Sequence, residues 1–177
     1  GLGLRMRPLT DTTPKPLLKV ADRTMLDQTL DHLAAAGVDA AVVNVHHLAA
    51  QVEQHLAARN GQLPDVILSD ECDRLLESGG GVLKALALLG DAPFFVLNGD
   101  MIYRDGGAQA LVRLASFWNP NVMDALLLVM PGGKAVGHDG PGDFFLDPDG
   151  RLRRRGQAAH APYVFMGVQI LKPELFQ

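Results

Sequence analysis

Hydrophobic positions along the chain follow two spacings. In four stretches apolar residues recur every three or four positions, as on one face of a helix: residues 25–33, 48–56, 82–89 and 108–118. Short apolar runs between these stretches predict buried strands at residues 40–45, 66–68 and 94–97. Strands that alternate with helices are typical of an α/β domain with a largely parallel sheet.

The pattern changes in the last third of the chain. Residues 124–130 predict a further apolar strand, after which glycine and proline become frequent. The apolar residues 144–146 followed by Pro148-Asp149-Gly150 are typical of a hairpin. Residues 163–171 predict a last strand with a glycine inside it.

Composition limits the classes of protein that the chain can represent. At 177 residues and 47% hydrophobic content, the chain can bury the core of one domain. The formal net charge of −4 disfavours binding to nucleic acid or to an anionic membrane. No apolar run reaches the length of a membrane span.

The single cysteine, Cys72, excludes an internal disulfide and fits a reducing compartment, so we predict a cytoplasmic protein. Asp70, Glu71 and Asp73 surround this cysteine in the sequence. Because neighbouring negative charges disfavour a thiolate, we expect a raised thiol pKa and an unreactive side chain.

The first residues of the chain carry its most specific motif. Gly1, Leu2 and Gly3 form a G-x-G loop, in which backbone N–H groups can turn toward one anion. Arg5 adds a planar guanidinium that matches phosphate oxygens, and Lys15 adds a mobile ammonium. These five residues therefore predict a polyphosphate site.

This motif differs from the better-known glycine-rich loops. The chain has no Walker A spacing, and Met6 stands where a dinucleotide fingerprint needs its third glycine. The compound pattern G-x-G-x-R-M-x-P-L-T, followed by P-K-P-L, resembles the sugar-1-phosphate nucleotidyltransferase family. Within that family the pattern is most similar to bacterial N-acetylmuramate-1-phosphate uridylyltransferases. The resemblance covers nearly the whole chain and implies a Rossmann-like three-layer sandwich of the nucleotide-diphospho-sugar transferase type.

The resemblance also bears on the two ends of the chain. Family members begin with an apolar strand that runs into the glycine-rich loop, and they end with a segment that carries a second metal-binding aspartate. This sequence starts at Gly1 inside the loop and stops at Gln177. We therefore expect a catalytic domain without its first strand and its C-terminal segment.

A second glycine-rich stretch, Gly79-Gly80-Gly81, stands before the predicted helix at residues 82–89. Unpaired N–H groups at a helix start, without side chains in the way, allow a flat ligand to lie against the backbone. The resemblance assigns this segment to the nucleobase. A flexible loop that enters the helix is the alternative.

The predicted strand at residues 94–97 runs directly into Asn98-Gly99-Asp100. A carboxylate just beyond the carboxyl end of a parallel strand lies where α/β sheets bind their ligands. Carboxylate oxygens suit Mg²⁺ that is shared with substrate phosphates. The resemblance places the metal-binding aspartate of the family at Asp100. A helix N-cap is the alternative role.

All nucleotide motifs lie in the first part of the chain. We therefore divide the single domain, residues 1–177, into a nucleotide-binding half of about 1–105 and a sugar-binding half of about 106–177. The resemblance implies that Asn98, Asp143 and Gly167 lie near the sugar, with a bulge as the alternative role of Gly167.

The sugar phosphate lacks one expected partner. Many relatives hold it with a lysine in the second half, but this chain has none between Lys134 and Lys172. An arginine among residues 151–155 could take its place, although we favour a solvated hairpin for that stretch.

Together these features predict an Mg²⁺-dependent nucleotidyltransferase with Arg5, Lys15 and Asp100 as catalytic residues. An oxygen of a sugar 1-phosphate would attack the α-phosphorus of a nucleoside triphosphate and release pyrophosphate. The closest resemblance implies UTP and N-acetylmuramate 1-phosphate. The alternatives are a mannose- or heptose-1-phosphate guanylyltransferase, a glucose-1-phosphate thymidylyltransferase, and a regulatory domain that binds nucleotide sugars without catalysis.

Overall fold

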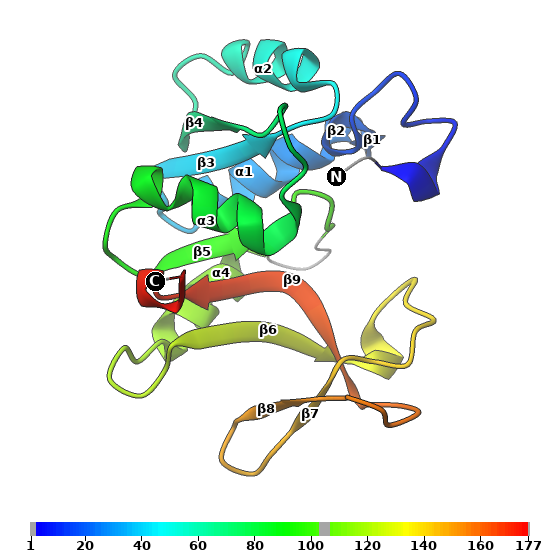
Figure 1. Cartoon of the computed structure of the whole chain (residues 1–177), viewed down its shortest axis with the longest axis vertical. Helices are drawn as coiled ribbons and strands as arrows, with labels where there is room; N and C mark the ends of the chain where they lie inside the picture. Colours follow the sequence, from blue (N-terminus) through cyan, green and yellow to red (C-terminus); the bar gives the residue numbers. More distant parts are fainter. Residues whose placement is uncertain (1–2, 103–106, 177) are drawn as a thin grey trace.

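The computed structural model describes residues 3–102 and 107–176 (Figure 1). Its helices are α1 Met25–Ala35, α2 Ala49–Ala57, α3 Glu77–Leu89 and α4 Gly107–Phe117, and its short 3-10 helices are η1 Leu4–Met6, η2 Lys15–Leu17, η3 Gly132–Lys134 and η4 Pro173–Phe176. Its strands are β1 Lys19–Val20, β2 Arg23–Thr24, β3 Ala40–Val45, β4 Asp65–Asp70, β5 Phe94–Leu97, β6 Ala125–Pro131, β7 Phe144–Leu146, β8 Leu152–Arg154 and β9 Tyr163–Leu171. The predicted helices and strands are therefore confirmed, and the short β1–β2 ribbon is an addition.

Helix α1 shows how the local sequence forms an element. The Thr24 hydroxyl oxygen accepts a hydrogen bond from the Asp27 backbone N–H at 3.0 Å and so caps the helix N-terminus. Gly37 follows the last turn with a left-handed φ of 81°, as expected of a C-cap glycine. The buried face of the helix consists mainly of leucines at helical spacing: Leu26, Leu30 and Leu33.

The strand pairings differ from the largely parallel sheet that alternating elements predict. Strands β3 and β4 pair in parallel, from Ala40 opposite Asp65 to Val45 opposite Asp70. Strand β9, in contrast, pairs antiparallel with β5 on one side and with β6 on the other. The connection from β6 to β9, all of which is described, contains the β7–β8 hairpin and no α-helical crossover. A hairpin reverses the direction of the chain, so β9 runs antiparallel to β6.

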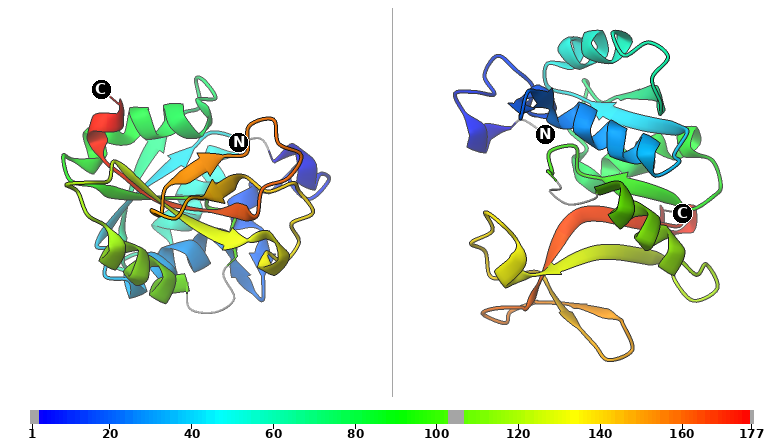
Figure 2. Two further views of the ribbon diagram at one scale, coloured as in Figure 1. Left: turned by 90° about the horizontal axis from the view of Figure 1, so that it is seen from below. Right: turned by 180° about the vertical axis from the view of Figure 1, so that it is seen from behind.

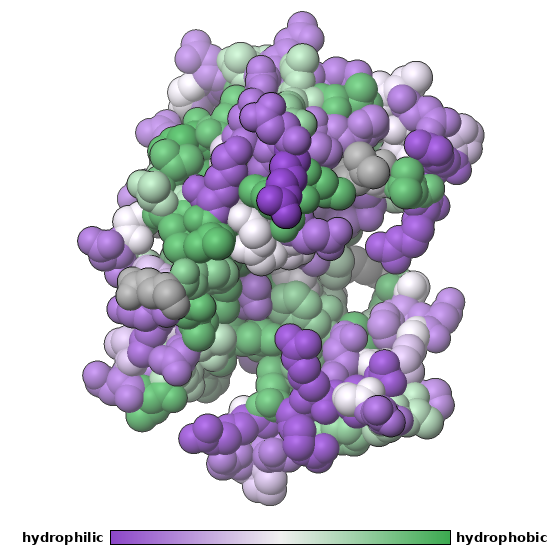
Figure 3. All heavy atoms as spheres, in the orientation of Figure 1, coloured by the Kyte–Doolittle hydropathy of each residue, from purple (hydrophilic) through white to green (hydrophobic). Residues whose placement is uncertain are grey.

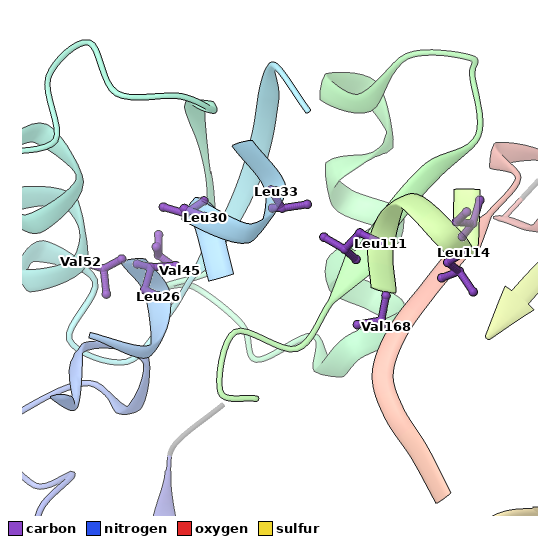
Figure 4. Packing of buried hydrophobic residues seen from close by; sticks show 9 residues of the cluster. Leu26, Leu30, Leu33, Val45, Val52, Leu111, Leu114 and Val168 are labelled. Carbon is purple, nitrogen blue, oxygen red and sulfur yellow. The ribbon is translucent and has the colours of Figure 1, made fainter. Parts of the chain in front are cut away.

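The elements form three layers. Helices α1 and α4 cover one face of the strands, and α3 lies on the other face (Figures 1 and 2). One hydrophobic cluster joins α1, α2 and α4 with the strands (Figure 4): Leu26, Leu30, Leu33, Val45, Val52, Leu111, Leu114, Val168 and Ile170. This core contains residues of both predicted halves, and the arrangement confirms the three-layer sandwich.

The β7–β8 hairpin extends away from these layers, at the bottom of the view in Figure 1. Strand β9 connects the hairpin to the main body. The first residue of β7, Phe144, pairs with the first residue of β9, Tyr163. The molecular surface is hollowed between the hairpin and the main body (Figure 3). Among the described residues, no helix has the length and apolar character that crossing a membrane requires.

Candidate active site

Two of the predicted catalytic residues meet in space. Lys15 and Asp100 are 85 positions apart, yet the Lys15 Nζ donates a hydrogen bond to the Asp100 Oδ2. Lys15 begins the 3-10 helix η2, directly after the buried Pro14, and Asp100 lies in the turn after β5. The two side chains are 26% and 33% exposed, so a ligand can reach both. The fold thus places one cation and one carboxylate together at the surface.

Gly3, the last residue of the G-x-G motif, is held by a threonine that the opening motif contains. Gly3 has a left-handed φ of 64°, which favours glycine. The Thr10 hydroxyl, which is only 2% exposed, donates to the Gly3 carbonyl at 2.8 Å, and the Met6 N–H donates to the same oxygen at 2.9 Å. Thr10 is the last residue of the opening motif, and this position was the sequence signal for its role. Gly1 and Leu2 lie outside the described residues.

Arg5 is exposed in the short helix η1. Among residues 3–102 and 107–176, its guanidinium has no hydrogen bond or ion pair, including none with Lys15 or Asp100. Its neighbour Arg7 differs, because Arg7 pairs with Asp11 at 3.0 Å. Arg5 is therefore available for a ligand, while its part in the site stays a prediction.

The three consecutive glycines lie inside α3, which corrects their predicted place before the helix. Helix α3 begins at Glu77 instead of residue 82. Glycines add no side chains to a hydrophobic period, so the apolar pattern detects the helix only after them. Gly79 is exposed and has open space where a Cβ would lie, Gly80 packs against Leu76, and Gly81 is buried. Contact of this segment with a nucleobase stays a prediction.

A buried polar network beside Gly81 was missed by the sequence analysis. Glu71 is only 6% exposed, and its Oε1 accepts a hydrogen bond from the Asn44 Nδ2 at 2.7 Å. The same nitrogen donates to the Gly81 carbonyl at 3.1 Å. Glu71 follows the carboxyl end of strand β4 directly, a signal of the same kind as that of Asp100 after β5.

Asp143 connects the hairpin to β9. Its Oδ2 accepts a hydrogen bond from the Phe165 backbone N–H at 2.9 Å, and its own N–H donates to the Tyr163 carbonyl at 2.7 Å. The preceding Gly142 is buried with a φ of 78°. Asp143 therefore anchors backbone, and its contact with a sugar stays a prediction.

The hairpin arginines are engaged locally, which agrees with the favoured solvated hairpin. Arg151 pairs with Asp149 at 3.1 Å, and the Arg153 guanidinium lies 4.6 Å from the centre of the Phe145 ring. Both side chains are mostly exposed, so these contacts contribute little to stability.

Gly167 lies against the turn that contains Asp100, and its lack of a side chain leaves room for that turn. It is buried with a φ of 66°, and the Asn98 backbone N–H donates to its carbonyl at 2.8 Å. A Cβ at Gly167 would lie 2.9 Å from the Asn98 Nδ2 and 3.0 Å from the Met101 Cγ. The β6–β9 register shifts between Leu127 and Val129, so the bulge alternative describes the backbone here. Proximity of Gly167 and the exposed Asn98 to a sugar stays a prediction.

The thiol of Cys72 behaves as its neighbours in the sequence predict. Its hydrogen bond with Asp70, together with partial desolvation and nearby negative charge, raises the pKa of the Cys72 thiol. The same hydrogen bond holds the pKa of Asp70 below its usual value. Cys72 is exposed, and the raised pKa keeps it a neutral thiol near pH 7.

A family model described as "Nucleotidyl transferase" matches residues 1–135 of the chain. The chain belongs to this family. The nucleotidyl transferase assignment confirms the resemblance on which the opening motif was interpreted.

Two curated relatives of this nucleotidyl transferase carry the same name. The chain is 45% identical over 177 residues to N-acetylmuramate alpha-1-phosphate uridylyltransferase of Caulobacter vibrioides, a match that covers 99% of this chain and 73% of that protein. It is 38% identical over 176 residues to the protein of that name in Neisseria meningitidis, covering 99% and 74%.

Solved structures confirm the fold. UDP-glucose pyrophosphorylase from Acinetobacter baumannii superposes with a TM-score of 0.77 at 22% identity, over 100% of this chain and 73% of that chain. A putative glucose-1-phosphate thymidylyltransferase from Bacillus anthracis superposes with a TM-score of 0.78 at 14% identity, over 99% and 70%. The fold is therefore that of the nucleotide-diphospho-sugar transferases.

The carboxylate of Asp100, which lies beside Lys15, has the chemistry of a metal ligand. Within the described ranges, no three His, Cys, Asp or Glu side chains gather as a complete metal site. Asp100 offers one partly exposed carboxylate. Mg²⁺ is commonly bound through one or two carboxylates plus substrate phosphates, so Asp100 fits a magnesium ion that arrives with a nucleotide.

Proposed function

We propose that this nucleotidyl transferase joins UTP to N-acetylmuramate 1-phosphate, forming UDP-N-acetylmuramate and pyrophosphate in the cytoplasm. The observation that carries the proposal is the 45% identity over 99% of the chain to a protein named for this activity. The meeting of Lys15 with Asp100 supports it, because nucleotidyl transfer needs positive charge and a metal ligand at one place.

In the proposed reaction, a phosphate oxygen of the sugar 1-phosphate attacks the α-phosphorus of UTP. A new bond forms between them, the bond from the α-phosphorus to the bridging oxygen breaks, and pyrophosphate leaves. The attacking oxygen is already anionic at neutral pH, so no general base is required. The chain therefore has to position two anions and offset their charge.

Each residue of the site has a proposed part in that task. The backbone around Gly3, held by Thr10, and the guanidinium of Arg5 bind the outer phosphates and stabilise the leaving pyrophosphate. The Lys15 ammonium lies between the α-phosphate and the incoming sugar phosphate. Asp100 would hold Mg²⁺, which when bound supplies positive charge to the phosphates.

Two further segments complete the proposal. The exposed start of the glycine segment of α3 lies against the uracil. Asn98, Asp143 and Gly167 contact the sugar, and the surface hollow between the main body and the hairpin leaves room for it (Figure 3). Apart from Asn98, this division keeps residues of about 1–105 for the nucleotide and those of about 106–177 for the sugar.

Pyrophosphate release by the protein with Mg²⁺ tests the proposal. UTP, GTP, CTP and dTTP are each combined with the 1-phosphates of N-acetylmuramate, N-acetylglucosamine, glucose and mannose. We expect one strong signal, for UTP with N-acetylmuramate 1-phosphate, and none when EDTA removes the metal. A strong signal for another pair would keep the reaction and overturn the substrates. Nucleotide binding without any release would favour the non-catalytic alternative.

A further inference from the structure

The start of helix α3 is weakly specified by its own sequence. Its N-cap residue is Leu76, and no side chain caps the helix there. Glycine in a helix costs about 1 kcal/mol relative to alanine, and three glycines follow within the first turns. Local interactions therefore do not hold the part of α3 that is proposed to bind the nucleobase.

A tertiary contact holds it instead. The Asn44 side chain, near the end of β3, directs its nitrogen toward two oxygens: the Glu71 Oε1 at 2.7 Å and the Gly81 carbonyl at 3.1 Å. An amide nitrogen has two hydrogens, so Asn44 can satisfy both acceptors at once. This one side chain thus joins the ends of β3 and β4 to the early turns of α3.

Glu71 is itself fixed on several sides. Its backbone N–H donates to the Val45 carbonyl at 2.7 Å, and the His46 Nδ1 donates to the Glu71 carbonyl at 2.6 Å. A Cβ at Gly81 would lie 2.7 Å from the Glu71 Oε1, so the carboxylate rests against the glycine backbone. This close approach leaves no room for a side chain at position 81 and so requires a glycine there.

We propose that Asn44 is a positioning residue for nucleotide binding. Through Glu71 and Gly81 it sets the place of the first turns of α3, on which the exposed Gly79 lies. This inference rests on the proposed function, because it takes the glycine segment as the contact of the nucleobase. Glu71 is buried and has no ion pair with any residue of 3–102 or 107–176. Burial of such a carboxyl group costs more than burial of an apolar residue, and a positioning role explains why Glu71 is there.

The test is Asn44→Asp, which keeps the size of the side chain but turns an acceptor oxygen toward Glu71 and Gly81. We expect the Kd for UTP, measured by titration calorimetry, to rise about tenfold, as for the loss of a hydrogen bond to a charged group. The KM for the sugar phosphate and kcat at saturating UTP should stay within about twofold, since the variant leaves Lys15 and Asp100 unchanged. Amide hydrogens of the first turns of α3 should exchange faster in the nucleotide-free variant.

Two further variants make the result specific. Asn44→Asp combined with Glu71→Gln exchanges donor and acceptor, because the introduced glutamine amide can donate to the new carboxylate. This double variant should therefore recover part of the UTP affinity. Asn60→Asp, the same change at an exposed position, should behave as the unmodified protein.

Three outcomes would overturn the inference: unchanged UTP affinity and exchange in Asn44→Asp, equal losses for both substrates with a lower melting temperature, or no recovery in the double variant. Failure of the proposed function looks different, because the unmodified protein would then bind no UTP. If it binds another nucleotide, the Kd for that nucleotide is the measure. If it binds none, the hydrogen exchange result still decides whether Asn44 positions α3, and the link to nucleotide binding is overturned.

Discussion

The two halves of the molecule are held together in different ways. In the nucleotide half, side chains that are far apart in the sequence meet, as Lys15 and Asp100 do. In the sugar half, hydrogen bonds with the backbone of β9, one donated by the Asp143 N–H and one accepted by its carboxylate, attach the hairpin next to the buried Gly142. Removing a charge of the proposed site should therefore impair turnover in the first half, whereas adding a single methyl group should impair stability in the second. Substitutions at Asp100, Gly142 and Arg5 test this difference, and those at Asp27 and Cys72 sharpen the account of the first half.

The largest effect is expected at Asp100. Asp100→Asn removes the charge that would bind Mg²⁺, so turnover should fall roughly thousandfold, or about 4 kcal/mol in barrier height. The melting temperature should hardly change, because the side chain is partly exposed. Steady-state pyrophosphate release and thermal unfolding measure the two quantities. Asp91→Asn, at an exposed position before β5, is the matched control, and a fully active Asp100→Asn would show that the metal ligand lies elsewhere.

Gly142→Ala should have the opposite profile. A Cβ there would overlap the Ala161 carbonyl oxygen and lie 2.9 Å from its carbon, at a φ of 78°. We expect a loss of about 3 kcal/mol in the free energy of unfolding. Gly150→Ala has a similar φ of 86° in open space and should lose only about 1 kcal/mol. Urea denaturation compares the two, and equal losses would mean that the backbone yields at Ala161.

Arg5→Ala should reduce turnover about hundredfold, as expected for losing one charged contact to the leaving group. Stability should be unaffected, since the side chain is exposed and has no partner among the described residues. Arg7→Ala, which removes only an exposed pair with Asp11, serves as the control. Equal loss of activity and stability in Arg5→Ala would assign Arg5 a structural role.

The Asp27 carboxylate should make stability depend on pH. Burial raises its pKa, but hydrogen bonds from Thr24, Arg59 and His55 outweigh burial and hold the pKa below the usual 3.8. The folded state thus binds this proton more weakly than the unfolded chain. Its contribution to stability is complete above the unfolded pKa and is lost as the pH falls through the folded pKa, that is, below about pH 4.

Asp27→Asn should therefore flatten the decline of the unfolding free energy between about pH 5 and pH 2. At pH 7 it should cost about 2 kcal/mol, because Arg59 is only 7% exposed and would lose its closest carboxylate, at 2.8 Å. Chemical denaturation across this pH range measures both effects. An unchanged slope would show that other carboxylates determine acid unfolding.

The smallest effect is expected at Cys72. The Asp70 hydrogen bond raises the pKa of this thiol, so it should react with iodoacetamide more slowly than free cysteine at pH 7. Asp70→Asn should increase that rate, and Cys72→Ser should change turnover by less than about twofold. Fast alkylation that abolishes turnover would contradict the prediction of an unreactive thiol.

Hydrophobic period and short motifs were sufficient to predict most elements of this chain. The leucines of α1 repeat at helical spacing, and the run at 94–97 leads to Asp100, so these features were readable from the residues. The opening motif likewise identified the family, because it combines two glycines, an arginine and a lysine at defined spacing. Both kinds of signal depend on residues that are close together in the sequence, so they can be read without knowledge of the tertiary structure.

Tertiary structure alone decided which distant residues meet. No local signal joins Lys15 with Asp100, or Asn44 with Glu71 and Gly81, because these contacts depend on how the strands are ordered in the sheet. The antiparallel pairing of β9 follows from a hairpin connection. The start of α3 at Glu77 lies before the apolar period that marks the helix in the sequence. Periodicity reports which face of an element is buried, whereas its neighbours are selected by packing across the whole chain.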